Sequence, residues 1–477
     1  MNAYFGHILS LLPIINPVIH CCMKTLLNRN YALQFSALLL VCLLNFCEVS
    51  GQSTVTTFAG DGLSGLINGD TTNCRFKSPD GICRDQSGNL FIADGDNHCI
   101  RKISPDGLVT TYAGTGLAGY ADGPAATAQF RTPFDVCVDG EGNVYVSDFE
   151  NQYIRRIDTD GTVSTVAGNG LAGYVDGPSA TAQFNYPRGI VIDATGNLYV
   201  SDSWNHRVRK IDASGEVSTY AGGGNIFGVQ SVSEFKDGSD TSARFYTPCG
   251  LSIDEIGNIY VADAYNHRVR KIDLSQYVST VAGTGISGAA GGGFVDGDLS
   301  VARFNTLTEL FVSGSGVIYV SDTYNNRMRK IENGIVSTLA GSGVAGYLDG
   351  PDSLAKFNHP RGVVLDGSDH SVLVCDGNNR RIRRVTIEAP TGIESLSASL
   401  GQAVFPNPSN GLFYFHEVGL HSIIKVSDIT GRLVTAIDIV KEDQFALDLT
   451  GQQAGMYLVT LTDKAGVVLC FKIYKTP

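Results

Sequence analysis

A repeated pattern with a period of about 54 to 61 residues runs through most of this 477-residue chain and limits its fold more than any other feature. Each copy has an Asp after a short apolar run, an Asn three residues later and an Arg seven residues later. All six copies keep the three residues, and the Asp positions are Asp94, Asp148, Asp202, Asp263, Asp322 and Asp376. Such a period with short strands predicts a propeller or another closed array.

Each copy contains four short apolar runs separated by Gly and Asp clusters. In the third copy they occupy 189–193, 198–202, 208–211 and 217–221. Runs of this length that are rich in Val, Ile and Tyr are typical of antiparallel strands. Four strands in each of six copies predict an all-β chain with a six-bladed β-propeller.

The two ends of the repeat region predict how the ring closes. The sixth copy stops after its third strand, at Val385, and the missing fourth strand matches the segment 55–60 near the N-terminus. We therefore expect the N-terminal strand to complete the last blade as its outermost strand, which covers an otherwise open sheet edge.

The units "NLYVSDSWNHRVRKID" and "NIYVADAYNHRVRKID" resemble NHL repeats. The resemblance implies a propeller that serves as a binding platform for protein or RNA, and a few relatives are metal-dependent lyases or hydrolases. The formal net charge of −12 argues against nucleic acid as a partner.

The repeated polar columns are interpreted as scaffold, because six symmetric copies cannot all serve one site. His98, His206 and His267 share one column and are expected to be turn residues rather than zinc ligands, since each belongs to a different blade. No catalytic residue, resident metal or cofactor is predicted. A calcium site at 237–240 or 296–298 stays open as an alternative, because acidic residues double up there.

Departures from the repeat mark the candidate ligand site. The first strand of a blade opens with Pro-x-Gly, but Asp135 and Glu309 replace the Gly in the opposed blades two and five. Arg188, Arg361 and Asp80 occupy the middle position of the motif in other blades. These five residues are predicted to line a channel mouth that binds a polar ligand. Since other blades use Gly there, replacing both acids by Gly is expected to leave folding intact.

The same face is expected to carry the glycine-rich loops between blades. These loops are about 20 residues long, and long ordered loops in a compact fold are often functional. The longest run from 222 to 244 and from 283 to 303.

Residues 1–51 are predicted to be an upstream extension and a secretory signal peptide, with the true start at Met23. A basic beginning and the apolar run 35–46 support this interpretation. The run is short for a membrane span, which needs about 20 residues. We expect no transmembrane span in the mature protein. A membrane anchor and a lipid anchor on Cys47 are the alternatives.

After the propeller at 52–385 and a linker at 386–403, residues 404–477 predict a small Ig-like β-sandwich. This region resembles the type A C-terminal sorting domain of the type IX secretion system. The residues that carry the resemblance are Pro406, Asn407, Pro408, Gly411, Gly431, Arg432, Gly455 and Tyr457. It implies the type IX secretion machinery as a partner and export to the surface or medium of a Bacteroidetes-like bacterium. A stand-alone adhesive domain is the alternative.

Together these features predict a secreted or cell-surface binding propeller with an extracellular protein or glycan as its ligand. An extracellular metal-dependent lyase or sugar-lactone hydrolase is the alternative, with the two acids holding the metal.

Overall fold

The structure is a computed structural model that describes residues 53–223, 235–288, 291–367 and 370–387, together with several short pieces of the C-terminal region. Those pieces are 404–405, 412–416, 421–428, 433–438, 444–463 and 468–475. The predicted signal peptide and nearly all of the predicted linker lie outside the described residues. The chain divides into two compact units, one with the repeats and one with the C-terminal strands, and each is described by itself.

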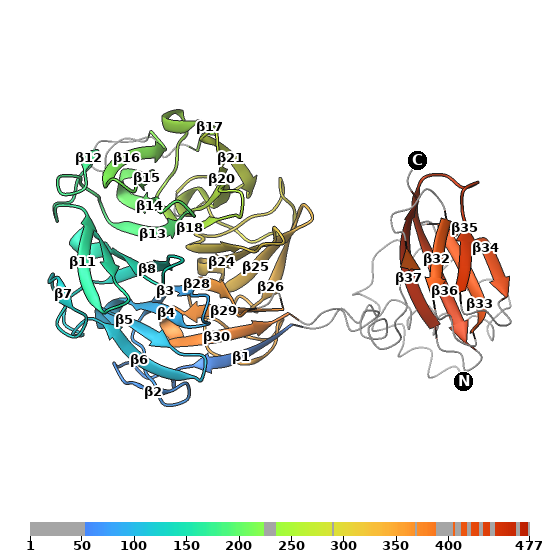
Figure 1. Cartoon of the computed structure of the whole chain (residues 1–477), viewed down its shortest axis with the longest axis horizontal. Helices are drawn as coiled ribbons and strands as arrows, with labels where there is room; N and C mark the ends of the chain where they lie inside the picture. The colour runs from blue at the N-terminus through green and yellow to red at the C-terminus, as the bar shows by residue number, and fades with distance from the viewer. Residues whose placement is uncertain are drawn as a thin grey trace, which may run out of the picture. The chain divides into compact units, whose positions relative to one another are not determined.

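Six antiparallel sheets surround a central channel and confirm the predicted six-bladed propeller (Figure 1). The first strand of each blade lies nearest the channel and the next three follow outward. In blades 1 to 3 these strands are β3 (Pro79–Arg84), β4 (Leu90–Asp94), β5 (Cys99–Ile103) and β6 (Leu108–Ala113); β8 (Pro133–Val138), β9 (Val144–Asp148), β10 (Tyr153–Ile157) and β11 (Thr162–Ala167); β13 (Pro187–Ile192), β14 (Leu198–Asp202), β15 (Arg207–Ile211) and β16 (Glu216–Ala221).

Blades 4 to 6 follow the same order. Their strands are β18 (Pro248–Ile253), β19 (Ile259–Asp263), β20 (Arg268–Ile272) and β21 (Tyr277–Ala282); β23 (Glu309–Val312), β24 (Ile318–Asp322), β25 (Arg327–Glu332) and β26 (Ile335–Ala340); β28 (Pro360–Leu365), β29 (Ser371–Asp376), β30 (Arg381–Thr386) and β1 (Thr54–Ala59).

The glycine-rich loops add a short fifth strand to every blade, which the sequence did not predict. Each loop leaves one blade and pairs two residues with the outer edge of the next blade. These strands are β2 (Gly69–Asp70), β7 (Gly123–Pro124), β12 (Gly177–Pro178), β17 (Gly238–Ser239), β22 (Gly297–Asp298) and β27 (Gly350–Pro351). The loops therefore protect blade edges that would otherwise offer unpaired backbone groups.

The N-terminal strand closes the ring as predicted. In β1, Val55 pairs with Val385 of β30 and Thr57 pairs with Arg383. Because β27 pairs with the other edge of β1, the closing strand is the fourth of the blade rather than its outermost strand.

A buried arginine holds each blade together, and blade 2 shows how. Arg155 is fully buried, and its Nη1 donates to Asp148 at 2.9 Å. Its Nη2 pairs with Asp122, which comes from the preceding loop. The guanidinium also lies between the rings of Tyr120 and Phe130, 4.8 and 5.2 Å from their centroids. We call this arrangement the arginine clamp. Its buried Arg and second-strand Asp recur as Arg101–Asp94, Arg209–Asp202, Arg270–Asp263, Arg329–Asp322 and Arg383–Asp376.

The clamp confirms that the Asp and Arg columns are scaffold. It also explains much of the loop length, because each loop delivers an acceptor to the next blade's arginine. Asp122, Asp176, Asp237, Asp296 and Asp349 do this in blades 2 to 6. Blade 1 uses the amide oxygen of Asn68 instead. The carboxylates of Asp237 and Asp296, which the open calcium alternative would need, are thus engaged by arginines.

The histidine column joins neighbouring blades. His206 has a left-handed backbone at the end of a turn, and its Nδ1 accepts a hydrogen bond from the Thr247 backbone N–H at 3.1 Å. Gln152 Oε1 does the same for Tyr186 N–H at 2.6 Å. His98, His267 and Asn326 accept from Thr132, Thr306 and His359. These side chains are turn residues, as predicted, and they also link one blade to the next.

The C-terminal unit contains two antiparallel sheets, as expected of a β-sandwich. One sheet has β31 (Val404–Phe405), β32 (Leu412–His416) and β35 (Gln444–Asp448), and the other has β34 (Leu433–Asp438), β33 (His421–Asp428), β36 (Gly455–Asp463) and β37 (Val468–Lys475). The likeness to an Ig-like domain stays a prediction.

Two of the predicted sorting residues lie in this described part. Gly455 opens β36, and the buried Tyr457 donates its hydroxyl to the Gln453 carbonyl at 2.6 Å. The other six lie outside the described residues: Pro406, Asn407, Pro408, Gly411, Gly431 and Arg432. In the parts of both units that the structure describes, no helix has the length and apolar character needed to cross a membrane.

Candidate functional site

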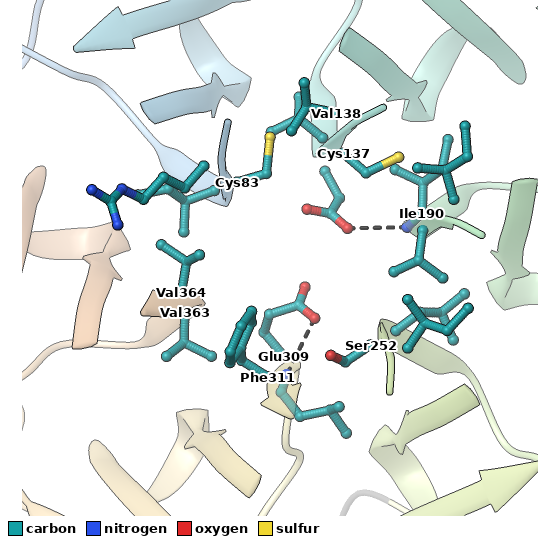
Figure 2. Close-up of a pocket in the computed structure, with 18 residues that line it drawn as sticks. Cys83, Cys137, Val138, Ile190, Ser252, Glu309, Phe311, Val363 and Val364 are labelled. Atoms are coloured by element: carbon teal, nitrogen blue, oxygen red, sulfur yellow. Dashed lines mark hydrogen bonds between the residues drawn. The ribbon is translucent and has the colours of Figure 1, made fainter. Parts of the chain in front are cut away.

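The central channel holds a cavity of about 220 Å³ (Figure 2). The later residues of the six inner strands line it, and most of them are aliphatic. Two acidic side chains break this apolar wall, Asp135 from β8 and Glu309 from β23. The volume exceeds the roughly 30 Å³ that one water occupies in the liquid, so the cavity has room for more than a single solvent molecule.

Both acidic side chains are almost completely buried. Asp135 is 5% exposed and Glu309 is 7% exposed. Asp135 Oδ2 accepts a hydrogen bond from the Ile190 backbone N–H at 3.0 Å, and Glu309 Oε1 accepts one from the Leu310 N–H at 3.1 Å. Figure 2 shows the Glu309 carboxyl group inside the ring of lining residues.

Glycines in neighbouring blades make space for these carboxyl groups. A Cβ placed on Gly81 would lie 2.1 Å from Asp135 Oδ1, and one placed on Gly250 would lie 1.8 Å from Glu309 Oε1. The acids of blades 2 and 5 therefore fit against the glycines of blades 1 and 4.

Burial changes the acidity of the pair. It raises the pKa of Asp135 to about 7 and raises the pKa of Glu309 well above its usual range. The negative charge of Asp135 raises the pKa of Glu309 further. A buried carboxyl group without a cationic partner prefers its neutral form, because the charge is poorly solvated. The pair therefore retains a proton near neutral pH.

The position of the two acids differs from the sequence prediction. They lie inside the channel and not at a solvent-exposed mouth, because the inner strand begins at the rim and its third residue is already below it. The expectation that Gly could replace both acids without loss of folding stays a prediction, and the structure shows which contacts of Asp135 the change would remove. Gly would leave the Ile190 N–H without its acceptor and open a space beside Gly81.

The other predicted site residues lie at the face where inner strands begin and second strands end, which we call the loop-rich face. Pairing of Pro133 with Asp148 shows that these two strand ends meet there. On this face Arg361 forms an ion pair with Asp80 of the adjacent blade 1. The Asp80 side chain is buried, so this pair joins blades 6 and 1 rather than leaving two free charges.

Arg188 lies on the same face but in a different environment. Its guanidinium carbon is 5.2 Å from the Phe134 ring centroid and 5.4 Å from that of Phe149. Nη1 donates to the Cys249 sulfur at 2.9 Å, and the buried Nε has no hydrogen-bond partner among the described residues. The structure thus separates the five predicted residues into a channel pair, an ion pair and an arginine among aromatic rings.

A row of aromatic side chains on the loop-rich face was missed by the sequence analysis. Its members are Phe134, Phe149, Tyr186, Trp204, Tyr246, Tyr265 and Tyr324, and we call it the aromatic arc. Ring centroids are 5.7 Å apart for Phe134–Phe149, 4.8 Å for Phe149–Tyr186 and 4.2 Å for Tyr186–Trp204. Tyr246 and Tyr265 follow at 5.3 Å in blade 4.

A sequence signal for the arc existed. The two positions after the repeat Asp read Phe149-Glu150, Ser203-Trp204, Ala264-Tyr265 and Thr323-Tyr324 in blades 2 to 5. Blades 1 and 6 have Gly95-Asp96 and Gly377-Asn378 instead. Aligning this column would have shown that four consecutive blades carry a ring, whereas the other two leave room for the Asp80–Arg361 pair. A Cβ on Gly95 would indeed lie 2.3 Å from Asp80 Oδ2.

The two longest loops are only partly described, because 224–234 and 289–290 lie outside the described residues. Within the described ranges, no group of three or more His, Cys, Asp or Glu side chains is placed to hold a metal ion.

Family models match two parts of the chain. The NHL repeat model matches residues 76–103, 184–211 and 245–272, and the model of the secretion system C-terminal sorting domain matches residues 403–474. The second match covers nearly all of the C-terminal unit and supports an exported protein.

Curated relatives share the repeats at low identity. The chain is 29% identical over 290 residues to SUPPRESSOR OF QUENCHING 1 of Arabidopsis thaliana, covering 58% of the chain and 27% of that protein. It is 27% identical over 312 residues to NHL repeat-containing protein 2 of Homo sapiens, covering 58% of the chain and 42% of the relative. The chain thus spans less than half of the length of these relatives.

Solved structures confirm the fold. A Bacteroides thetaiotaomicron protein of unknown function has a TM-score of 0.53 and 21% identity, with 70% of this chain and 76% of that chain covered. An auxiliary nutrient binding protein from the same species has a TM-score of 0.52 and 19% identity, with the same coverage. At these identities the likeness shows the fold alone. The chain therefore contains NHL repeats folded as a β-propeller, followed by a C-terminal region that matches the secretion system sorting domain.

Proposed function

We propose that this protein is exported by the type IX secretion machinery and binds a glycan outside the cell, at the aromatic arc of its propeller. The sorting domain supports export to the medium or the cell surface. The aromatic arc is the observation that carries the choice of ligand.

Neighbouring aromatic rings that lie tilted against one another on one face suit a sugar chain. The less polar face of a pyranose ring packs against an aromatic ring, while sugar hydroxyls need polar partners at the edge of the site. Phe149, Trp204 and Tyr265 come from successive blades, so the arc follows the rim of the channel rather than forming a single pocket. Such a row fits several consecutive sugar units.

Charged groups beside the arc supply polar contacts. Arg188 is held by Phe134 and Phe149, and its Nη1 donates to the Cys249 sulfur. A planar guanidinium is well suited to paired hydrogen bonds with a carboxylate or sulfate group. An acidic glycan is therefore the favoured class. The name of the nutrient-binding structural neighbour agrees with a binding role, but the proposal rests on the arc.

The binding proposal can be tested with the one tryptophan of the chain, Trp204. Titration of the wild-type protein with a panel of neutral, carboxylated and sulfated oligosaccharides should change its intrinsic fluorescence. In calorimetry, Tyr186→Ala and Trp204→Ala should each weaken binding about tenfold or more, the usual effect of truncating a central aromatic contact. Tyr277→Ala is the matched control, because Tyr277 is exposed but lies at the outer strand β21.

Two results would argue against the arc as a glycan site. Either no member of the panel changes the fluorescence, or the two arc variants bind as tightly as the control. If a protein partner is captured and its binding depends on Trp204, the face is a binding site but the ligand class is wrong.

Export is tested separately by mass spectrometry of the mature protein. The sequence predicts an N-terminus near Gln52 and loss of the region after about Ala403 once the protein is outside the cell. A surface protein that retains the C-terminal unit would favour the adhesive alternative. No observation on the described residues favours the metal-dependent lyase or lactone hydrolase, so catalysis is not proposed.

A further inference from the structure

The channel contains two buried acids that the scaffold does not neutralise. Every buried aspartate of an arginine clamp has a guanidinium beside it, as Asp148 has Arg155. Among the described residues, no Lys, Arg or His forms an ion pair with Asp135 or Glu309. Arg361 of the loop-rich face is paired with Asp80 instead. Two buried acids without a cationic partner lower the stability of the fold. Groups of this kind are candidates for a functional site.

The two acids accept hydrogen bonds from the backbone. Asp135 Oδ2 and Glu309 Oε1 accept backbone N–H groups from Ile190 and Leu310. Both of these donors are backbone groups, and no described side chain donates a hydrogen bond to either carboxyl group. Both side chains line the same cavity of about 220 Å³, and the charge of Asp135 raises the pKa of Glu309.

The other polar groups around the cavity do not compete for the acids. Arg84 also lines the cavity, but its guanidinium points to a turn of blade 6. A Cβ placed on Gly367 in that turn would lie 2.5 Å from Arg84 Nη1. Ser252 Oγ accepts the Val312 N–H at 3.0 Å. Two thiols line the cavity, those of Cys83 and Cys137, and burial raises the pKa of both, which keeps them neutral.

The remaining wall is apolar. Val136, Ile190, Leu251 and Val363 line the cavity, and the ring of Phe311 adds an aromatic surface. Figure 2 shows Phe311, Val363 and Glu309 around the same space. A ligand of this cavity therefore needs a cationic or strongly donating group for the acids and a hydrocarbon part for the wall.

We propose that the channel binds a small organic cation, a primary alkylammonium, with its charged nitrogen between Asp135 and Glu309. An ammonium group has three N–H donors and no acceptor, which suits carboxylate oxygens, since these only accept. The alkyl part replaces water against Val, Ile and Leu side chains and can lie beside Phe311. A divalent metal fits less well, because calcium takes six to eight oxygens and the cavity wall supplies few beyond these two carboxyl groups. The site is separate from the aromatic arc and does not depend on glycan binding.

Binding of a cation should release a proton. Burial raises the pKa of Asp135 to about 7 and raises that of Glu309 well above its usual range, so the empty pair is partly protonated at neutral pH. A positive charge between the acids favours their ionised forms. Affinity should therefore rise as pH rises from 6 to 8, although an alkylammonium keeps its own charge over that range.

Calorimetry with n-butylammonium tests the proposal on the full chain. Wild-type protein should bind it about tenfold or more tightly at pH 8 than at pH 6, because the acids ionise in between. The neutral analogue 1-butanol should bind more weakly and without pH dependence. The double variant Asp135→Asn, Glu309→Gln keeps both side-chain shapes and an acceptor for Ile190, and should lose butylammonium binding by about tenfold or more. Glu255→Gln removes an exposed carboxylate from a turn of blade 4 and should have no effect.

Several outcomes would overturn the proposal. They are an absence of butylammonium binding, equal binding of butanol, binding that is independent of pH, and undiminished binding by a folded double variant. Tight calcium binding that the double variant loses, without butylammonium binding, would assign the pair to a metal instead. If the double variant does not fold, the wild-type pH series and the butanol comparison still decide the question.

Discussion

Two sets of buried carboxylates in this propeller have nearly the same burial and opposite surroundings. Asp148 in a clamp accepts hydrogen bonds from the Arg131 N–H, the Asn151 amide and the Arg155 guanidinium. Asp135 in the channel accepts a hydrogen bond from the Ile190 N–H and forms no ion pair among the described residues. Burial raises the pKa of Asp148 to about 6, still low enough for ionisation at neutral pH, whereas that of Asp135 reaches about 7.

The difference separates scaffold from candidate site. The clamp occurs in all six blades and its charges neutralise one another. The channel acids occur in two opposed blades and remain unbalanced. Burial alone does not distinguish the clamp aspartates from the channel acids. The number and charge of their hydrogen-bond donors do.

Removing β1 is expected to cause the largest loss of stability, because the arginine clamp of blade 6 depends on this strand. Thr57 donates its N–H and its hydroxyl to Asp349 Oδ2 at 3.1 and 2.9 Å, and Val55 and Ala59 are fully buried. Deleting Thr54–Ala59 opens β30 and should lower the free energy of unfolding by about 5 kcal/mol or more, the scale of a whole domain's stability. Urea denaturation measures it. Thr57→Val loses only the hydroxyl and should cost about 1 kcal/mol; equal midpoints for the deletion and the wild type would contradict the closure.

Breaking one arginine clamp should cause the second largest loss of stability. Asp148→Asn leaves the Arg155 charge buried without its carboxylate and should destabilise the propeller by about 3–5 kcal/mol in chemical denaturation. Glu150→Gln is the control in the same blade, since it breaks only the exposed Arg131–Glu150 pair at 3.0 Å and should cost about 1 kcal/mol or less. Similar losses in the two variants would show that the clamp is no stronger than a surface pair.

Neutralising the channel acids should raise the free energy of unfolding at alkaline pH, whereas the two changes above lower it. The folded pKa of Asp135 is about 7, above about 3.9 in the unfolded chain, so its contribution to stability is present below pH 3.9 and lost as pH rises through 7. The variant Asp135→Asn, Glu309→Gln does not titrate there. It should match the wild type near pH 4 and be more stable by about 4 kcal/mol at pH 8. A variant that is less stable at pH 8 would mean that the acids support the fold.

The smallest effect concerns the side chains that join blades. Burial lowers the pKa of His206 to about 4, below about 6.5 in the unfolded chain, so its contribution is present above pH 6.5 and lost as pH falls towards 4. His206→Gln should keep the hydrogen bond, because Gln152 performs it in blade 2. Between pH 7.5 and pH 5 the wild type should lose about 2 kcal/mol more than this variant. Parallel pH profiles would show that His206 does not titrate as proposed.

Much of the scaffold could be predicted because it depends on local patterns. The repeat period and the alternation within short runs indicate strands and blades without reference to distant residues. The match between 55–60 and the fourth strands predicted closure, since a closed ring must pair its last edge. Columns that are identical in all six copies also identified Asp148 and Arg155 as structural.

The site could not be predicted in the same way, because it depends on how far residues lie from the channel axis and on which blades meet. Only the packing of consecutive blades brings Asp135 against Gly81 and Ile190, which belong to two other blades. The same holds for Phe149 and Tyr186, whose rings are 4.8 Å apart. By itself the sequence determined the propeller and its closing strand, and it indicated the C-terminal sorting domain. The tertiary structure decided which acids lie in an apolar interior without a cation, because desolvation and pairing depend on neighbours from other blades.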